Sequence, residues 1–181
     1  LELGEELAGK RLFLQFDGAA HIATVYVNGQ ELMTHRTGYT AFRCEITDFV
    51  HIGEENTVTV RLDTTENPDV PPFGFVIDYL TYGGLYREVW LDVRQQDMIT
   101  DLYITTPTLT RMQLQITAVN AENCKVKVEL LNDAGKLVLV SKPFVPGGKA
   151  AMNFQNAKPW TLDDPCRYTC RVTLLNEAGA A

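Results

Sequence analysis

Short runs of alternating apolar and polar residues recur along this chain, and they constrain its fold more than any other feature. Residues 89–93 are typical, because Val89, Leu91 and Val93 fall on one face while Trp90 and Asp92 fall on the other. This is the period of a half-buried β-strand. No stretch has a sustained helical period, and neither a β–α–β alternation nor a phosphate-binding loop is present. The pattern predicts an all-β protein.

The alternating runs form two groups, separated by the polar residues 94–97. The first group comprises residues 11–17, 21–27, 31–33, 41–46, 57–62 and 88–93. Asn28-Gly29 predicts a tight hairpin within it, because both residues accept the positive φ of a type I′ turn. The second group comprises residues 99–105, 112–119, 124–131, 136–144, 150–154 and 168–175. We therefore expect two domains, at residues 1–97 and 98–181, and the second group predicts an antiparallel sandwich. Trp160 breaks the rhythm and is expected to plug one end of that sandwich.

The composition favours a packed protein without a nucleic-acid or membrane partner. Of 181 residues, 45% are hydrophobic and 22% are charged, which is enough apolar material for a core. The net charge is -7 and no Lys/Arg cluster occurs, which argues against nucleic acid or an anionic membrane. No apolar run approaches the ~20 residues that span a bilayer, and the N-terminus does not resemble a signal peptide. We expect a cytoplasmic origin.

The cysteines, histidines and acids do not form a metal-binding pattern. The four cysteines, at positions 44, 124, 166 and 170, include no C-x-x-C pair, and the three histidines lie far from them in sequence. A zinc site is therefore not expected. The acids between residues 63 and 69 do not have the spacing of a calcium loop. We expect reduced thiols, no metal and no cofactor.

The candidate functional segment is the long loop that precedes the strand at 88–93. Residues 63–77 contain three prolines, and loops of this length are usually functional or disordered. The loop leads into Asp78, a lone carboxylate among aromatic residues, and then into Gly83-Gly84, which permit a sharp turn or a close approach. A carboxylate accepts hydrogen bonds from sugar hydroxyls, and aromatic rings cover the apolar face of a sugar. Asp78 and Tyr82 are therefore candidate sugar-binding residues, with a plain surface loop as the alternative. Arg87 is expected to pair with a backbone or carboxylate group.

Several motifs occur in an order that resembles a known family. They are VYVNG at 25–29, HRTGYTAF at 35–42, ITD at 46–48, ENTVTV at 55–60 and YGGLYREVWL at 82–91. In this order they resemble the N-terminal sugar-binding domain of glycoside hydrolase family 2, which includes β-galactosidases, β-glucuronidases and β-mannosidases. Residues 156–175 are similar to the end of the immunoglobulin-like domain that follows it in that family.

The resemblance implies a galactose-binding-like jelly-roll sandwich followed by an immunoglobulin-like β-sandwich. A jelly roll has about eight strands, whereas six runs precede residue 98, so we expect an N-terminally incomplete jelly roll. The second domain shows six runs and by a seven-strand count lacks its last strand. Its immunoglobulin likeness concerns topology only, without a disulfide. In the family a (β/α)₈ barrel with two catalytic glutamates follows, so the chain is expected to be part of a larger enzyme.

The function implied by the resemblance is that of the non-catalytic N-terminal portion of a retaining glycosidase, with a β-galactosidase as the preferred assignment. Retaining hydrolysis needs two carboxyls about 5–5.5 Å apart. In the family the acid/base glutamate follows an Asn. The only Asn-Glu pair in this sequence is Asn176-Glu177, in a polar turn, so we expect no catalytic residue in this chain. By the resemblance, Asp78 contacts sugar hydroxyls in the barrel's active site, and Tyr82 lines the same loop.

The implied partners are the barrel domain and a β-galactoside or related glycoside, and assembly into a homo-oligomer stays open. Two alternatives remain, an independent carbohydrate-binding module and a purely structural β-sandwich protein. A module would need a sugar platform of several exposed aromatic residues, for which the tyrosines at 79, 82 and 86 are the candidates.

Overall fold

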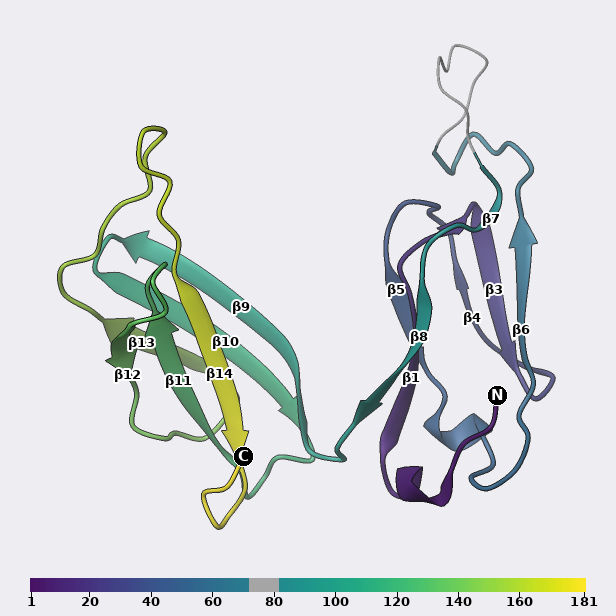
Figure 1. Ribbon diagram of the computed structural model, residues 1–181, viewed down its shortest axis with the longest axis horizontal. Coiled ribbons are helices and arrows are strands. Elements are labelled where there is room, and N and C mark those ends of the chain that lie inside the picture. The colour runs from purple at the N-terminus through teal and green to yellow at the C-terminus, as the bar shows by residue number, and fades with distance from the viewer. Residues whose placement is uncertain (72–81) are drawn as a thin grey trace. The chain divides into compact units, whose positions relative to one another are not determined.

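The computed structural model describes residues 1–71 and 82–181 (Figure 1). The chain divides into two compact units, Leu1–Gln95 and Gln96–Ala181, here called unit 1 and unit 2. The described residues form β-strands and two short 3₁₀ helices, with no α-helix among them, which confirms the all-β prediction. In the described part of the chain, no helix is long and apolar enough to cross a membrane.

Unit 1 is a sandwich of two three-stranded antiparallel sheets, ordered β5-β1-β8 and β4-β3-β6, with a small third sheet of β2 and β7 (Figure 1). All six predicted runs are strands. The strands β2 and β7 have two residues each, which is too short for alternation to reveal them. The elements are η1 (Glu5–Leu7), β1 (Arg11–Phe16), β2 (Ala19–Ala20), β3 (Ile22–Val27), β4 (Gln30–His35), β5 (Phe42–Glu45), η2 (Thr47–Phe49), β6 (Val58–Asp63), β7 (Gly84–Leu85) and β8 (Val89–Arg94).

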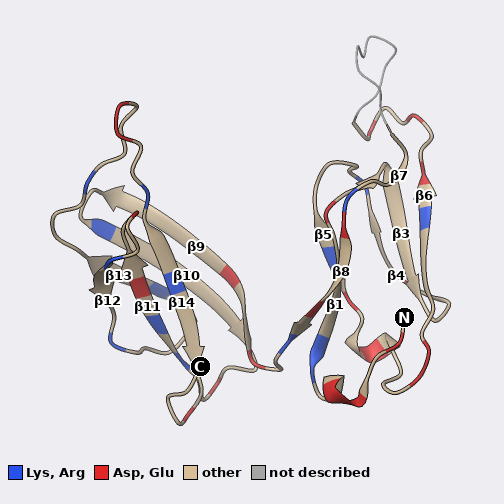
Figure 2. Cartoon of the chain, viewed as in Figure 1, with Lys and Arg blue, Asp and Glu red and all other residues tan. Residues whose placement is uncertain are grey.

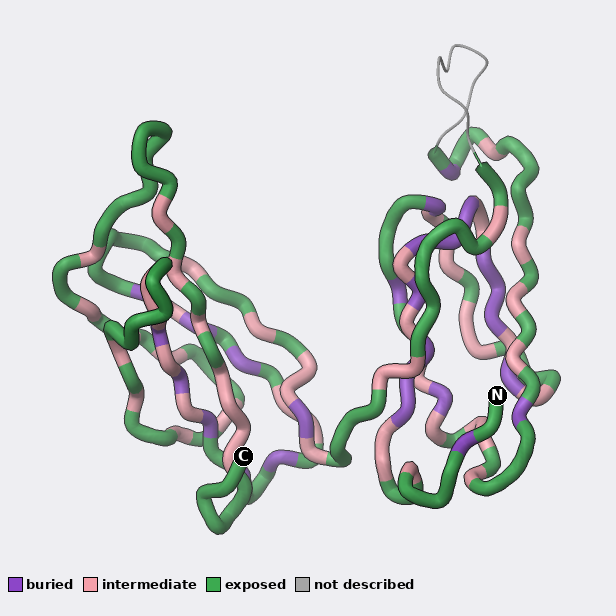
Figure 3. The backbone as a smooth tube through the Cα atoms, viewed as in Figure 1, coloured by how far each residue is buried: buried purple, intermediate pink, exposed green. Residues whose placement is uncertain are grey.

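The core of unit 1 lies between its two larger sheets and takes alternate residues of the central strands β1 and β3. Figure 3 shows buried residues along these strands. Phe16 of β1 stacks on Phe42 of β5 with ring centroids 4.7 Å apart, and His35 of β4 stacks on Phe42 at 4.2 Å. This stack joins strands of both sheets. The buried members of the core are Leu3, Leu12, Leu14, Phe16, Ala19, Ala23, Val25, Val27, Phe42, Cys44 and Ile46.

The Asn28-Gly29 hairpin forms between β3 and β4 as predicted, with φ of 48° and 82°. The Asn28 amide nitrogen donates to the Asn56 side-chain oxygen at 2.8 Å, and its own oxygen accepts the Thr57 N–H at 2.9 Å. Asn56 is only 1% exposed. Its amide group also bonds to the His51 N–H and C=O and to the Glu54 C=O. The buried amide is therefore fully satisfied and joins the hairpin turn to the 51–57 loop.

Unit 2 is a second antiparallel sandwich, with sheets ordered β13-β10-β9 and β12-β11-β14. All six predicted runs are strands, and the two sheets fit the predicted immunoglobulin-like architecture. The core is aliphatic, from Met112, Leu114 and Ile116 on one sheet and Val126, Val128 and Leu130 on the other. The strands are β9 (Met98–Thr108), β10 (Arg111–Val119), β11 (Lys125–Leu131), β12 (Leu137–Val140), β13 (Lys149–Asn153) and β14 (Thr169–Leu175).

Strand β12 ends earlier than the predicted run at 136–144. At Ser141 the side-chain hydroxyl accepts the Val128 N–H at 2.9 Å, so a side chain takes the place of a backbone acceptor. Pro143, two residues later, has no N–H to donate to a neighbouring strand. Local chemistry thus interrupts a run whose hydrophobic pattern continues.

Candidate functional site

Of the two predicted sugar-binding residues, Asp78 lies outside the described residues and Tyr82 lies at the point where the described chain resumes. The Tyr82 side chain is 69% exposed, so its ring is available to a ligand. Tyr82 belongs to unit 1, where residues 82–87 lead from the long loop into β8. The sugar-binding role of both residues stays a prediction.

Residues 82–87 are fixed by two other segments, 17–20 and 38–39, and we call these three segments the loop base. Strand β7 pairs with β2, with Leu85 opposite Ala19 and Gly84 opposite Ala20. The Tyr86 hydroxyl donates to the Gly38 carbonyl at 2.5 Å. The Arg87 guanidinium donates to the carbonyls of Asp17 and Tyr39, both at 3.3 Å. This confirms the backbone pairing expected for Arg87.

The glycines of the loop base are required by close packing and by backbone conformation. A Cβ on Gly83 would lie 2.4 Å from the Thr64 methyl carbon, and Gly84 has a φ of +114° that other residues rarely adopt. A Cβ on Gly18 would lie 3.0 Å from Tyr86 ring atoms and from the Arg87 side chain. Of the two roles predicted for Gly83-Gly84, a sharp turn or a close approach, the close approach is confirmed at Gly83.

The two ends of the long loop approach each other at this base, because Thr64 packs on Gly83. On the first end, the Asp63 carboxylate accepts the Thr65 N–H at 2.9 Å. This hydrogen bond lowers the pKa of the Asp63 carboxyl from its ordinary value. Asp63 therefore stays ionised at neutral pH and holds the turn that brings Thr64 against Gly83.

The other candidate chemical groups were also located. Glu177 lies exposed in the turn at 176–180, where the Asn176 N–H donates to the Ala180 carbonyl at 2.8 Å. The four cysteines are free thiols. Among the described residues, no group of three or more His, Cys, Asp or Glu could hold a metal ion. Lys and Arg are distributed over separate strands and loops of each unit (Figure 2).

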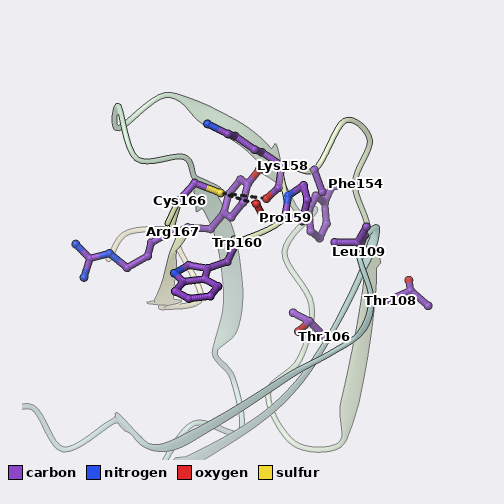
Figure 4. Close-up of a pocket in the computed structure, with 11 residues that line it drawn as sticks. Thr106, Thr108, Leu109, Phe154, Lys158, Pro159, Trp160, Cys166 and Arg167 are labelled. Carbon is purple, nitrogen blue, oxygen red and sulfur yellow. Dashed lines mark hydrogen bonds between the residues drawn. The ribbon is translucent and has the colours of Figure 1, made fainter. Parts of the chain in front are cut away.

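Unit 2 contains a surface hollow of about 210 Å³ beside Trp160 (Figure 4). The Trp160 side chain is 58% exposed, so the prediction that it plugs the end of the sandwich is wrong. The core beneath is closed by other residues, including Phe154 and Tyr168, whose ring centroids are 6.1 Å apart. The hollow could not be predicted from the sequence pattern, because its residues come from three separate segments.

Comparison with known protein families matches both units. Residues 1–94 match the model for the sugar binding domain of glycosyl hydrolases family 2, and residues 98–181 match a second model of glycosyl hydrolases family 2. These two models cover the jelly-roll and immunoglobulin-like parts that the sequence motifs suggested.

Individual relatives carry two different names. A β-galactosidase from Thermoanaerobacter pseudethanolicus is 32% identical over 97% of this chain and 25% of its own length. A β-glucuronidase from Bacteroides fragilis is 41% identical over 74% of this chain and 19% of its own length. The crystal structure of a Bacteroides uniformis β-glucuronidase matches all of this chain and 24% of its own, with a TM-score of 0.81 and 24% identity, and this likeness concerns the fold. The chain thus spans about a quarter of the length of these relatives.

Proposed function

The chain belongs to glycosyl hydrolase family 2, and on this premise we propose that it is the non-catalytic sugar-binding and immunoglobulin-like portion of a retaining glycosidase. The observation that supports the proposal best is the loop base. Two other segments of unit 1 hold residues 82–87 in place, and the exposed ring of Tyr82 stands at the end of the loop that carries Asp78.

The proposed substrates are β-galactosides or β-glucuronides. The relatives support both, because one named β-galactosidase and one named β-glucuronidase match the chain at comparable identity. The narrower proposal, that the substrate is a β-galactoside, follows from the sequence resemblance. The proposed partner is the catalytic barrel domain of the same enzyme, which supplies the two carboxyls needed for retaining hydrolysis.

In this proposal, Asp78 binds and orients the sugar and does not transfer a proton. An ionised carboxylate is an acceptor only, so it recognises hydroxyl groups through their O–H donors. The Tyr82 ring covers an apolar face of the sugar beside it. Because a carboxylate–hydroxyl bond contributes about 1.5–3 kcal/mol, loss of Asp78 is expected to lower kcat/KM by ~10- to 100-fold.

The test uses the full-length enzyme that carries this chain, assayed with p-nitrophenyl β-galactoside and p-nitrophenyl β-glucuronide. Asp78→Ala should lower kcat/KM for the preferred substrate and leave the melting temperature unchanged. Asp69→Ala, an exposed acid on the same loop, is the matched control and should change neither quantity. Equal activity of the Asp78→Ala variant and the parent would show that Asp78 does not contribute to substrate binding.

A second measurement separates an enzyme portion from an independent binding module. The 181-residue chain alone, titrated with galactose and glucuronate and followed by NMR, should show no Asp78-dependent binding below millimolar concentration, because half a site lacks most contacts. Tight binding that disappears in Asp78→Ala would instead indicate a complete sugar site in this chain and favour a carbohydrate-binding module.

A further inference from the structure

The hollow beside Trp160 lies wholly within unit 2 (Figure 4). Its lining is mainly apolar, with Leu109, Pro159 and Trp160, and includes the Thr106 hydroxyl. The charged ends of Lys158 and Arg167, which also contribute to the lining, extend outward, away from Leu109 and Thr106 (Figure 4).

The segment that carries Trp160 is held in place by its own bonds. The Tyr168 hydroxyl accepts the Lys158 N–H at 2.8 Å. The Cys166 thiol donates to the carbonyls of Lys158 and Pro159, at 3.2 and 3.4 Å (Figure 4). The Lys158 ammonium also forms an ion pair with the Asp164 carboxylate. The hollow is therefore preformed, and a ligand would lose little free energy in ordering it.

Two large apolar residues that line this hollow are exposed, Trp160 at 58% and Leu109 at 59%. An indole ring offers a flat apolar face with a single polar N–H, which suits the apolar face of a pyranose ring. The Thr106 hydroxyl of the same lining can donate to a ring oxygen or accept from a sugar hydroxyl.

We propose that this hollow binds one pyranose ring of a saccharide, with Trp160 as the stacking surface. A volume of about 210 Å³ accommodates one ring and not a longer chain, because pockets for drug-sized ligands begin at about 300 Å³. The choice of glycosides as the ligand class rests on the proposed function, although the site does not involve Asp78 or Tyr82. A neutral galactoside and an anionic glucuronide share the required ring.

The chain offers a simple reporter, since Trp90 and Trp160 are its only tryptophans. In a Trp90→Phe background, the fluorescence of Trp160 is titrated with methyl β-galactoside and, separately, with methyl β-glucuronide. We expect a saturable change with at least one sugar.

A second experiment assigns the binding to the hollow. In NMR titrations of the 181-residue chain, shifts should cluster at residues 106–109 and 154–168, and Trp160→Ala should weaken binding by about tenfold. Trp90→Ala, at the chain's other exposed tryptophan, is the matched control and should bind normally. Since both tryptophans are exposed, neither variant should unfold the protein.

Two outcomes would overturn the proposal. The first is no response of Trp160 to either sugar near its solubility limit, and the second is binding that is unchanged in Trp160→Ala. Shifts that depend on protein concentration without sugar would instead assign the surface to self-association and would also overturn it. Because Asp78→Ala leaves the hollow intact, failure here is distinguishable from failure of the proposed function, which is measured by kcat/KM at the loop base.

Discussion

Each unit presents one strongly exposed aromatic residue on a fixed loop, but the two loops are fixed in different ways. Beside Tyr82, the bonds of the loop base join residues that are 48 and 70 positions apart in the sequence. Beside Trp160, the side-chain hydrogen bonds within residues 158–168 join residues 3 to 10 positions apart, and one longer bond, from the Arg167 N–H to the Asp133 carboxylate, spans 34 positions. The loop base is thus a product of the whole of unit 1, whereas the segment that carries Trp160 is held mainly by its own bonds.

This difference decides how each site responds to destabilisation. Long-range bonds form only after the chain between their ends has been ordered, so they depend on the free energy of folding of the unit as a whole. Local bonds can persist when a distant part of the same unit is weakened. Substitutions far from Tyr82 should therefore disturb the loop base, while the surroundings of Trp160 should respond mainly to changes within the segment itself and at Asp133.

The largest expected effect is that of Asn56→Ala in unit 1. Removal of this buried amide leaves the His51 N–H and C=O, the Glu54 C=O and the Asn28 side chain without their partner. The expected loss in the free energy of unfolding of unit 1 is about 3 kcal/mol or more. Urea titration followed residue by residue in NMR spectra measures each unit separately, and unit 2 should keep its stability.

Asn176→Ala in unit 2 is the matched control for this prediction. Asn176 also accepts a backbone N–H with its side chain, from Ala180 at 2.9 Å, but it does so in an exposed turn. Its removal should cost less than about 1 kcal/mol, because water can replace the lost partner. Equal losses for the two asparagines would contradict the view that burial makes Asn56 a central element of unit 1.

A pair of tyrosine variants tests the comparison at the two sites directly. Tyr86→Phe removes the bond to Gly38 and should lower the free energy of unfolding of unit 1 by about 1 kcal/mol. Because the bond fixes residues 82–87, it should also raise KM of the full-length enzyme. Tyr168→Phe removes an equivalent bond to the Lys158 N–H in unit 2, and it should shift the Trp160 resonances without changing KM.

The two tyrosine variants can also fail in an informative way. If Tyr86→Phe lowers stability but KM stays constant, the bond to Gly38 has no part in positioning the sugar-binding loop. If Tyr168→Phe changes KM, the hollow and the proposed active site are coupled. A Gly18→Ala variant gives an independent test, because its Cβ would press on the Tyr86 ring without removing the hydroxyl.

The sequence was sufficient to predict the strands and the tight hairpin. Alternation has a period that follows from the pleat itself, so it revealed every strand of four or more residues in both units. The Asn28-Gly29 turn was equally predictable, because few residue pairs accept two positive φ angles in succession. These features depend on residues that are adjacent in the sequence, so they can be predicted from the sequence alone.

The anchors of the loop base were harder to predict, because they depend on residues that are distant in the sequence. No local pattern indicates that the Tyr86 hydroxyl would meet the Gly38 carbonyl or that β7 would pair with β2. The prediction that Trp160 plugs the sandwich was wrong for a different reason. It relied on the tendency of large apolar residues to be buried, but the core of unit 2 was already filled by strand residues.

The smallest expected effect concerns the ion pairs of the two units. In unit 1, Arg11 donates to both carboxylate oxygens of Glu45, at 2.8 and 2.6 Å, and this hydrogen bonding lowers the pKa of the Glu45 carboxyl. Because the folded-state pKa is lowered, the ionised carboxylate stabilises unit 1 at pH values above the unfolded-state pKa. This stabilisation is lost as the pH falls through the folded-state pKa. Since Glu45 is 38% exposed, Glu45→Gln should cost only ~0.5 kcal/mol at pH 7. The cost should disappear in urea titrations of unit 1 only when the pH falls through the lowered folded-state pKa of Glu45, where the carboxyl is protonated in the parent as well. A cost that persists there would assign the contribution of Glu45 to packing instead of charge.

The Lys158–Asp164 pair of unit 2 is exposed at both residues, so Asp164→Asn should change the surroundings of Trp160 and leave the free energy of unfolding of unit 2 unchanged.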